Sequence, residues 1–332
     1  MGELPVSLVD GFGRAHRDLR VSLTDRCSLR CTYCMPADGL PWIPSADMLT
    51  TAELVRVVAV AVDLGIEEVR LTGGEPLLHP DVVEVVGRLQ RLPRAPEVSL
   101  TTNGLRLPGL AAPLADAGLQ RVNISLDTLR RDRFVALTRR DRLVDVLAGV
   151  AAAKAAGLHP VKVNAVLMRG VNDDEAVGML RWARDEGLQL RFIEQMPLDP
   201  QHSWDRGRMV TAAEVLVSLS QSFALSPAPA RGSSPAEEWL VDGGPATVGV
   251  VGSVTRPFCG ACDRVRLTAD GQLRSCLFAP DETDLRTAIR AGASDDEIAA
   301  RVRACLSSKR AGHGIDDPGF LQPTRPMSAI GG

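Results

Sequence analysis

The stretch DLRVSLTDRCSLRCTYCMP, residues 18–36, joins a strand-like run to a loop that carries three cysteines. The strand-like part covers residues 18–24, and Cys27, Cys31 and Cys34 follow it with the spacing C-x3-C-x2-C. Folds built from parallel strands keep their functional groups in the loops at the C-terminal ends of those strands. The sequence therefore predicts a functional site directly after the first strand.

Helix-like stretches alternate with further strand-like runs along the first two thirds of the chain. The later runs lie at residues 67–73, 97–102, 120–126, 161–167 and 188–194. This alternation indicates repeated βα units, joined by right-handed crossovers, and a parallel sheet. Six units are too few for a closed eight-stranded barrel, so we predict an α/β fold with an incomplete (open) (β/α)6 barrel of the TIM type.

The texture of the sequence changes after about residue 222. Residues 222–239 are rich in Pro, Ser, Ala and Gly and show neither helical nor strand periodicity. Beyond them we expect strands at 238–243 and 246–252, a hairpin within 264–278, and helices near 283–291 and 294–307. We therefore predict two domains, a barrel over residues 1–222 and a C-terminal α+β domain over residues 223–332.

The composition limits the partners of this chain. Its 332 residues carry a formal net charge of -3 and 4% aromatic side chains, which gives no broad basis for binding nucleic acid. No run approaches the roughly 18 apolar residues of a membrane span, and the N-terminus lacks the basic and apolar regions of a signal peptide. We therefore expect a cytoplasmic protein without a membrane or nucleic-acid partner.

The seven cysteines form two triplets and one singleton, Cys305. The second triplet is Cys259, Cys262 and Cys276, with the spacing C-x2-C-x13-C. In a reducing compartment such cysteines indicate metal binding or catalysis before disulfides. Structural zinc usually takes four ligands, whereas three thiolates can hold a [4Fe-4S] cluster and leave one iron open. For the second triplet a zinc ribbon, either lacking a ligand or completed by Cys305, stays an alternative.

The first triplet resembles the motif of the radical S-adenosylmethionine superfamily, because Tyr33 lies between its last two cysteines and GGEP (Gly73 to Pro76) follows the second strand. From about residue 11 to the end, the chain also resembles the GTP 3′,8-cyclase family within that superfamily. The matching motifs include VNISLDTL (122–129), KVNAVLMRGVND (162–173), RFIEQMP (191–197), FCGACDRVRLTADGQLRSCLF (258–278) and the terminal IGG. The resemblance implies one [4Fe-4S] cluster on each triplet and S-adenosylmethionine as a further cofactor.

The resemblance also implies roles for single residues. Gly74 would contact the methionine part of S-adenosylmethionine, at a turn whose two glycines allow a close approach between backbone and ligand. Tyr33, Ser125 and Met196 would complete that pocket. The positions that match GTP-binding residues of the family are Arg20, Arg70, Thr101, Lys162, Arg264, Val265 and Arg266, with Arg191 as a weaker candidate.

Two further expectations concern the C-terminus and two arginine-rich segments. By resemblance, the terminal Gly331 and Gly332 would reach into the active site, since residues without Cβ atoms can pass a narrow opening. In contrast, LRRDRF (129–134) and TRRDRL (138–143) have the composition of charged surface, and we expect them to be ordinary helix or loop surface.

By resemblance, the chain would use a 5′-deoxyadenosyl radical to remove hydrogen from C3′ of GTP and would join C3′ to guanine C8. The product would begin molybdenum cofactor biosynthesis, with cyclic pyranopterin monophosphate synthase acting next. The implied partners are GTP, an external electron donor and a second copy of the chain in a homodimer. No side chain is expected to be catalytic, because cofactors carry the chemistry. The alternatives are another two-cluster radical enzyme, such as a peptide-modifying one, and a non-enzymatic iron-sulfur or zinc protein.

Overall fold

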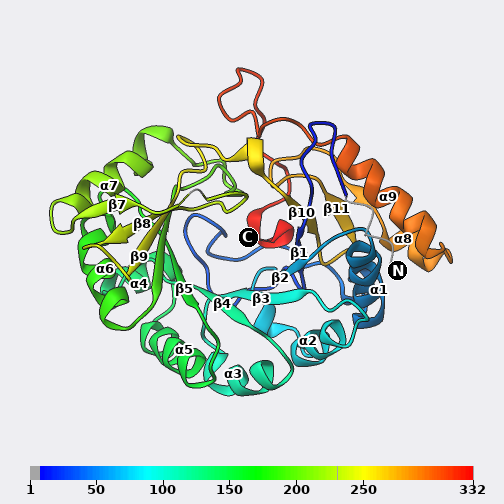
Figure 1. Cartoon of the computed structure of the whole chain (residues 1–332), viewed down its shortest axis with the longest axis horizontal. Helices are drawn as coiled ribbons and strands as arrows, with labels where there is room; N and C mark the ends of the chain where they lie inside the picture. The colour runs from blue at the N-terminus through cyan, green and yellow to red at the C-terminus, as the bar shows by residue number, and fades with distance from the viewer. Residues whose placement is uncertain (1–7, 230, 332) are drawn as a thin grey trace.

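The computed structural model describes residues 8–229 and 231–331, whose twelve strands form one curved sheet (Figure 1). The spatial order is β12-β11-β10-β1-β2-β3-β4-β5-β6-β9-β8-β7. The strands are β1 (Asp18–Ser22), β2 (Glu68–Thr72), β3 (Glu97–Thr102), β4 (Arg121–Ser125), β5 (Val161–Val166), β6 (Gln189–Ile193), β7 (Leu225–Pro227), β8 (Glu237–Val241), β9 (Thr247–Val251), β10 (Arg264–Leu267), β11 (Gln272–Arg274) and β12 (Thr283–Asp284). Strands β1 to β6 pair in parallel and in sequence order, so the predicted open α/β barrel is confirmed.

Helices cover the outer face of this sheet, as Figure 1 shows. The α-helices are α1 (Thr51–Asp63), α2 (Val82–Gln90), α3 (Leu107–Asp116), α4 (Arg131–Thr138), α5 (Leu143–Ala155), α6 (Ala176–Asp185), α7 (Ala212–Ser220), α8 (Arg286–Arg290), α9 (Asp295–Ser307) and α10 (Met327–Ile330). Short 3-10 helices lie at Ser45–Asp47, Pro76–Leu78, Asp173–Glu175, Arg206–Arg208 and Cys259–Ala261. The first helix begins at a capping box, in which Thr50 and Glu53 each accept a hydrogen bond from the other's backbone N–H.

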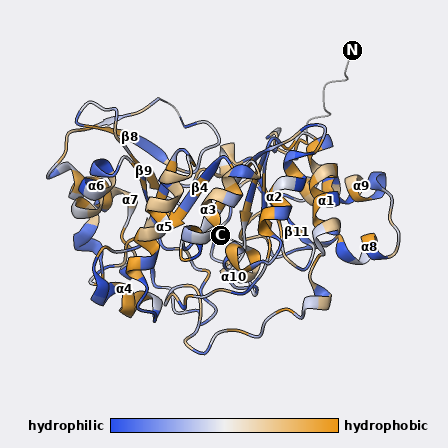
Figure 2. Cartoon of the chain, turned by 90° about the horizontal axis from the view of Figure 1, so that it is seen from below, coloured by the Kyte–Doolittle hydropathy of each residue, from blue (hydrophilic) through white to orange (hydrophobic). Residues whose placement is uncertain are grey.

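Alternation along the strands separates the core from the interior of the barrel. On β1, Leu19 and Val21 are 1% and 0% exposed and pack in the apolar core, whereas Arg20 between them points to the other face. Burial of each such aliphatic side chain contributes about 1.5–3 kcal/mol, which fixes both the register of the strand and the face that the helices cover. Figure 2 shows apolar and polar residues on the same helices, consistent with one buried side. Polar side chains are therefore left to line the interior.

Strands from the last third of the chain extend the barrel sheet at both edges. Strand β9 pairs in parallel with β6, and β10 pairs in parallel with β1. The predicted strands and the 264–278 hairpin are present, but they join the sheet of the barrel. The helix expected near 283–291 begins only at Arg286, because Thr283 and Asp284 pair with β11 instead. The domain boundary at residue 222 stays a prediction.

No helix in the described part of the chain combines the length and the apolar character that a membrane crossing requires.

Candidate active site

A cavity of about 230 Å³ lies at the C-terminal ends of the central strands. Loops after β1, β2, β3, β4 and β6 line it, as expected for a barrel of parallel strands. Its lining brings together all the residues predicted for the first cluster and for S-adenosylmethionine, namely Cys27, Cys31, Tyr33, Cys34, Gly74, Ser125 and Met196, and it also includes Thr101. These residues therefore form a single site, although they span the sequence from 27 to 196.

The cluster loop, residues 25–39, is fixed by hydrogen bonds to the C-terminal end of α4. The backbone N–H of Arg30 donates to the carbonyl of Thr138 (3.0 Å), and that of Thr32 donates to Leu137 (2.9 Å). These carbonyls belong to the last turn of a helix, where no intrahelical donor is available to them. The loop thus satisfies the helix end, and the helix end holds the three cysteines in place.

The charged stretches expected to be ordinary surface contribute to the frame of this site. Arg133, with a side chain 20% exposed, pairs with Glu175 at 2.8 Å. Arg139 has a left-handed backbone (φ 56°), and its guanidinium donates to the carbonyls of Arg30 (2.8 Å) and Met35 (3.1 Å) in the cluster loop. The expectation of ordinary surface was wrong for these two arginines, which bind residues of the site's frame. Composition could not reveal these contacts, because the partners lie 42 and 109 residues away in the sequence.

The GGEP turn needs its glycines for contact with the cluster loop. A Cβ atom on Gly73 would lie 2.3 Å from the carbonyl oxygen of Thr24, and one on Gly74 would lie 2.3 Å from that of Arg26. The N–H of Gly74 donates to Thr24 (2.7 Å), and the N–H of Glu75 donates to Arg26 (2.7 Å). Sequence reasoning attributed the close approach to a ligand, whereas the nearest atoms are those of the neighbouring loop. The turn still lines the cavity.

Glu75 supports the loop of the first triplet, a role that sequence reasoning missed. Its buried carboxylate accepts hydrogen bonds from Thr102 Oγ1 (2.7 Å) and from the N–H groups of Asn103 (2.7 Å) and Leu77 (2.9 Å). Burial raises the pKa of Glu75, although these donors act in the opposite direction. Asn103 in turn donates from Nδ2 to Ser28 Oγ (3.1 Å) in the cluster loop. The GGEP turn and the LTTNG segment after it (residues 100–104) therefore together support the first triplet.

Asp127 is a second missed position, and it holds Tyr33. The hydroxyl of Tyr33 donates to Asp127 Oδ2 (2.7 Å), and the N–H of Val166 donates to Oδ1 (2.9 Å). Burial raises the pKa of Asp127 to about 6, and the two donors only partly oppose that effect. The only sequence signal for this carboxylate is its place two residues after Ser125, at the end of β4.

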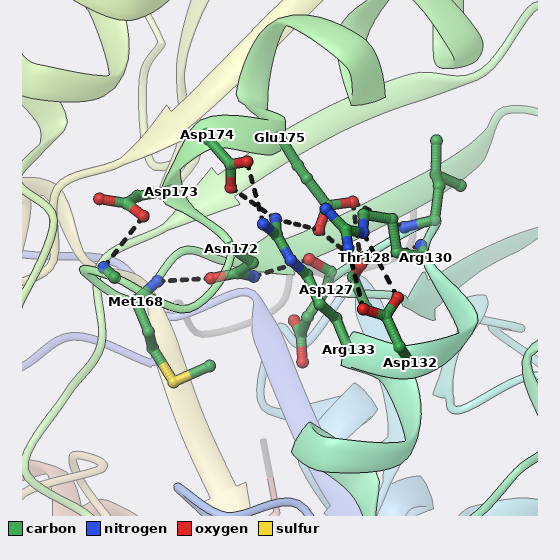
Figure 3. Close-up of polar contacts among 12 residues, drawn as sticks. Asp127, Thr128, Arg130, Asp132, Arg133, Met168, Asn172, Asp173, Asp174 and Glu175 are labelled. Carbon is green, nitrogen blue, oxygen red and sulfur yellow. Dashed lines mark hydrogen bonds and ion pairs between the residues drawn. The ribbon is translucent and has the colours of Figure 1, made fainter.

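Polar contacts join the loop after β4 to the loop after β5 (Figure 3). Asn172, fully buried, donates from Nδ2 to the backbone carbonyl of Asp127 (2.7 Å). Glu175 accepts a hydrogen bond from Thr128 Oγ1 (2.7 Å) and pairs with Arg133. These contacts therefore fix the backbone that carries Asp127 to the loop after β5.

The first triplet fits a cluster better than a single ion. Burial raises the pKa of the Cys34 thiol to about 12 and that of Cys31 well above its ordinary value, so cationic iron would have to displace these protons on binding. Within residues 8–229 and 231–331, no three His, Cys, Asp or Glu side chains converge closely enough to hold one metal ion. In a cubane each thiolate binds a different iron, so the sulfurs need not converge on one point. Three cysteines on one cavity wall meet that requirement.

The second triplet lines a smaller cavity of about 70 Å³. Cys259, Cys262 and Cys276 share its lining with Met196, which also lines the first cavity, so the two cavities adjoin. Cys305 does not line it; this thiol is 6% exposed and donates to the carbonyl of Leu273 (3.7 Å). The geometry gives no support to a zinc ribbon completed by Cys305.

The predicted GTP-binding bases lie side by side on the inner face of the sheet. Across neighbouring strands, Arg20 is in register with Arg70 on β2 and with Arg266 on β10. These three arginines and Arg264 act on one buried carboxylate, Asp18, whose pKa they lower although burial alone would raise it. The closest approach between Arg20 Nε and Asp18 is 3.8 Å, which is too long for a hydrogen bond.

Burial without full pairing also shifts the pKa values of the other predicted GTP-binding bases. It lowers the pKa of Arg266 and of Arg191 to about 10 each and that of Lys162 to about 8, with nearby positive charge adding to the effect on Arg191 and Lys162. Buried side-chain donors that find no hydrogen-bond partner in the described part of the chain include Arg20 Nε, Arg191 Nε and Arg264 Nε. A buried cationic surface with unused donors is the physical signature of an anion site.

Val265 stands apart from its neighbours in the predicted set. It is 1% exposed and lies in the apolar core, because it alternates with Arg264 and Arg266 on β10 and faces the helices. A contact from this position to a ligand in the interior could come only from its backbone. The GTP-binding prediction therefore does not extend to its side chain.

The C-terminal segment turns into the centre of the barrel, as Figure 1 shows. Ser22 Oγ donates to the carbonyl of Ile330 (3.0 Å), and Arg266 donates to the carbonyl of Gly331. Gly331 has φ 91°, and a Cβ atom there would lie 2.1 Å from Ser22 Oγ and 2.6 Å from Thr72 Oγ1. Gly331 thus lies among the inner side chains of β1, β2 and β10. Gly332 lies outside the described residues.

Comparison with known proteins agrees with this geometry. A family model described as the radical SAM superfamily matches residues 21–183, and one described as Molybdenum Cofactor Synthesis C matches residues 188–315. The structure of Streptococcus suis SuiB bound to S-adenosylmethionine has a TM-score of 0.60 at 12% identity, covering 95% of this chain and 77% of that chain, which is a likeness of fold alone.

Two curated relatives match nearly the whole sequence. A GTP 3′,8-cyclase of Streptomyces coelicolor is 62% identical over 328 residues, which cover 98% of this chain and 96% of that protein. A GTP 3′,8-cyclase 2 of Mycobacterium tuberculosis (strain H37Rv) is 58% identical over 331 residues, which cover 98% of this chain and 92% of that protein. With identity at this level over both cavities and the strands between them, this chain belongs to the GTP 3′,8-cyclase family of radical S-adenosylmethionine enzymes.

Proposed function

We propose that this chain converts GTP to 3′,8-cyclo-7,8-dihydroguanosine 5′-triphosphate, the first step of molybdenum cofactor biosynthesis. The observation that carries the proposal is the set of buried bases beside two adjoining cavities, each lined by a cysteine triplet. A nucleoside triphosphate has the chemistry for this interior, because its phosphate oxygens can accept from arginine donors that are otherwise unused.

The residues of the first cavity would hold one cluster and S-adenosylmethionine. When bound and reduced by an external electron donor, these cofactors would supply the 5′-deoxyadenosyl radical that takes hydrogen from C3′ of GTP. C3′ would then bond to guanine C8, and one further electron and a proton would complete the product. Cys27, Cys31 and Cys34 would ligate three irons, and the GGEP backbone beside them would receive the methionine end of the cofactor. Tyr33, fixed by Asp127, would border its other end.

The strands between the two triplets would orient the substrate. Arg20, Arg70 and Arg266 lie in one row across three strands and would bind the triphosphate. The second cavity, with its own triplet, would hold the other cluster, whose open iron would receive the guanine end. Because the groups that bind the substrate are fixed on strands, the nucleoside would be held with little loss of geometry during the reaction.

A peptide-modifying two-cluster enzyme is the alternative within the superfamily. A peptide would require no row of inward-facing arginines across β10, β1 and β2, which favours a nucleotide over a peptide substrate. The electron donor, the homodimer, the downstream synthase and the cytoplasmic location remain predictions from the family.

The test is turnover by the anaerobically reconstituted chain with dithionite, S-adenosylmethionine and GTP that carries deuterium at C3′. The expected result is 5′-deoxyadenosine that contains deuterium, together with a new isomer of GTP resolved by chromatography. A Cys31→Ala variant should form neither product. Unlabelled 5′-deoxyadenosine with unchanged GTP would reject the proposal.

A further inference from the structure

A buried polar chain adjoins the second triplet, and none of its members, Asp10, Arg14, His16 and Lys309, is a predicted ligand of a cluster, of S-adenosylmethionine or of GTP. Its central member is Lys309, which follows α9 and is 5% exposed. Lys309 Nζ donates to the carbonyl of Arg264 (2.6 Å) and to Cys262 Sγ (3.7 Å), and it lies 3.5 Å from His16 Nδ1. One ammonium group therefore contacts both a predicted cluster ligand and the backbone of β10.

The other members of the chain hold this lysine from the N-terminal side. His16, 1% exposed, contacts Asp10 Oδ2 through Nε2 (3.0 Å). Arg14 donates from Nε to the same Asp10 oxygen (2.6 Å) and from Nη1 to the carbonyl of Cys259 (2.7 Å). Two segments remote in sequence from the second triplet thus contact two of its three cysteines.

The choice of lysine at this position is informative. The sequence contains only three lysines among 38 basic residues, namely Lys154, Lys162 and Lys309. Lys154 forms an exposed pair with Glu186, whereas within the described residues Lys309 contacts a carbonyl, a thiol and an imidazole but no carboxylate. An ammonium is a compact charge that can approach one sulfur and donate to it, which a planar guanidinium does less well.

We propose that Lys309 is a positioning residue that sets the reduction potential of the second cluster. Positive charge and hydrogen bonds at ligand sulfurs stabilise the reduced, more negative form of an iron-sulfur cluster. By donating to Cys262 Sγ, Lys309 raises the potential of that cluster, and Asp10 and His16 hold the lysine side chain in place. The inference rests on a cluster at the second triplet and not on the identity of the substrate, so it can fail while the proposed function stands.

The test isolates the second cluster in the full-length chain. Replacement of Cys27, Cys31 and Cys34 by alanine removes the first cluster, and the remaining one is titrated by electron paramagnetic resonance after anaerobic reconstitution. Adding Lys309→Met should leave the iron content unchanged and lower the reduced-to-oxidised ratio at a fixed potential at least tenfold, which is about 59 mV for a one-electron couple. Lys154→Met is the matched control and should leave the ratio unchanged.

A second substitution keeps the proposal testable if the Lys309→Met variant fails to retain the second cluster. Lys309→Gln keeps an N–H donor, one bond closer to the backbone, but removes the charge, and it should give a shift in the same direction that is no larger than that of methionine. Lys309→Arg should restore much of the parent potential, since it returns the charge. A parent-like potential in the glutamine variant, or in a methionine variant that retains its iron, would overturn the proposal.

Discussion

Arg20 on β1 lies directly across from Arg266 on β10, and both side chains point to the interior of the barrel with little exposure. Two like charges in register on adjacent strands repel each other, and both lose hydration. Burial lowers the pKa of Arg20 well below its ordinary value, which expresses the same cost. The arrangement therefore costs free energy in the absence of an anion, and a bound triphosphate would offset that cost.

Replacement of Arg20 by methionine should change folding and binding in opposite directions. The free energy of unfolding of the ligand-free chain should rise, because a buried charge without a hydrogen-bond partner at Nε is removed. The dissociation constant for GTP should increase about tenfold or more, since a hydrogen bond to a charged group contributes about 1.5–3 kcal/mol. Thermal unfolding and equilibrium binding measure the two effects. Arg131→Met, which breaks an exposed pair with Asp141, should change neither. Weaker binding accompanied by lower stability would point to a purely structural role.

Lys162 should make GTP affinity depend on pH in the weakly alkaline range. Its pKa is lowered to about 8, mainly by burial, so the side chain loses its charge as the pH rises through that value. A triphosphate binds the charged form more tightly, and the affinity should therefore fall between pH 7 and pH 9. The measurement is the dissociation constant across this range. Lys162→Arg should bind GTP with little change over the same range, because arginine stays charged. An identical pH dependence in the two proteins would contradict the prediction.

Gly74→Ala should prevent formation of the first cluster. The added Cβ atom would lie 2.3 Å from the carbonyl oxygen of Arg26 and 2.5 Å from that of Asp25, so the cluster loop would have to move. Iron content after reconstitution should fall by about half, with the second cluster retained. Gly178→Ala in α6 is the matched control, because a Cβ atom there meets nothing within 4 Å and alanine favours helix. Full iron content in the Gly74→Ala variant would contradict the prediction, because it would show that the cluster loop can move without loss of the cluster.

Local patterns made much of the frame predictable. The six strands were readable from alternating runs, and the first cysteine triplet was readable because its three residues lie in one loop, where spacing is a local property. The sequence revealed only part of the role of Gly74. Its sequence signal, two glycines after a strand, indicates a close approach, but the approaching atoms of Asp25 and Arg26 come from the preceding βα loop.

Contacts between loops were beyond the reach of local patterns. Tyr33 and Asp127 are 94 residues apart, and Glu75 meets Asn103 only because β2 and β3 are neighbours in the sheet. Arg139 could not be distinguished from an exposed arginine by composition, since its guanidinium bonds only backbone carbonyls. Such partners become visible when the strand order is known, because that order decides which loops meet.

Asp127→Asn should change how stability depends on pH. The pKa of Asp127 in the folded chain is raised from 3.8 to about 6, so the folded state holds a proton that the unfolded state has lost between these values. The free energy of unfolding therefore falls as the pH rises from about 4 to about 6, by up to about 3 kcal/mol, and stays lower above pH 6. Asparagine cannot ionise and should remove this decline. Denaturant unfolding of both proteins at pH 5 and pH 8 measures it, and parallel curves would exclude Asp127 as the source.

Gly331→Ala should abolish turnover and leave the fold intact. Gly331 has a φ of 91°, which strains any residue with a Cβ atom, and that atom would collide with Ser22 Oγ and Thr72 Oγ1. The segment would leave the interior, and the donors that hold it, Ser22 and Arg266, would lose the carbonyls that they bind. Thermal unfolding should change little, because few core residues are involved, whereas product formation should fall at least a hundredfold, about 2.7 kcal/mol in transition-state free energy. Gly319→Ala, where a Cβ atom meets nothing within 4 Å, should retain full turnover. Truncation of residues 331–332 should reproduce the loss, and an active truncated enzyme would exclude the segment from the reaction.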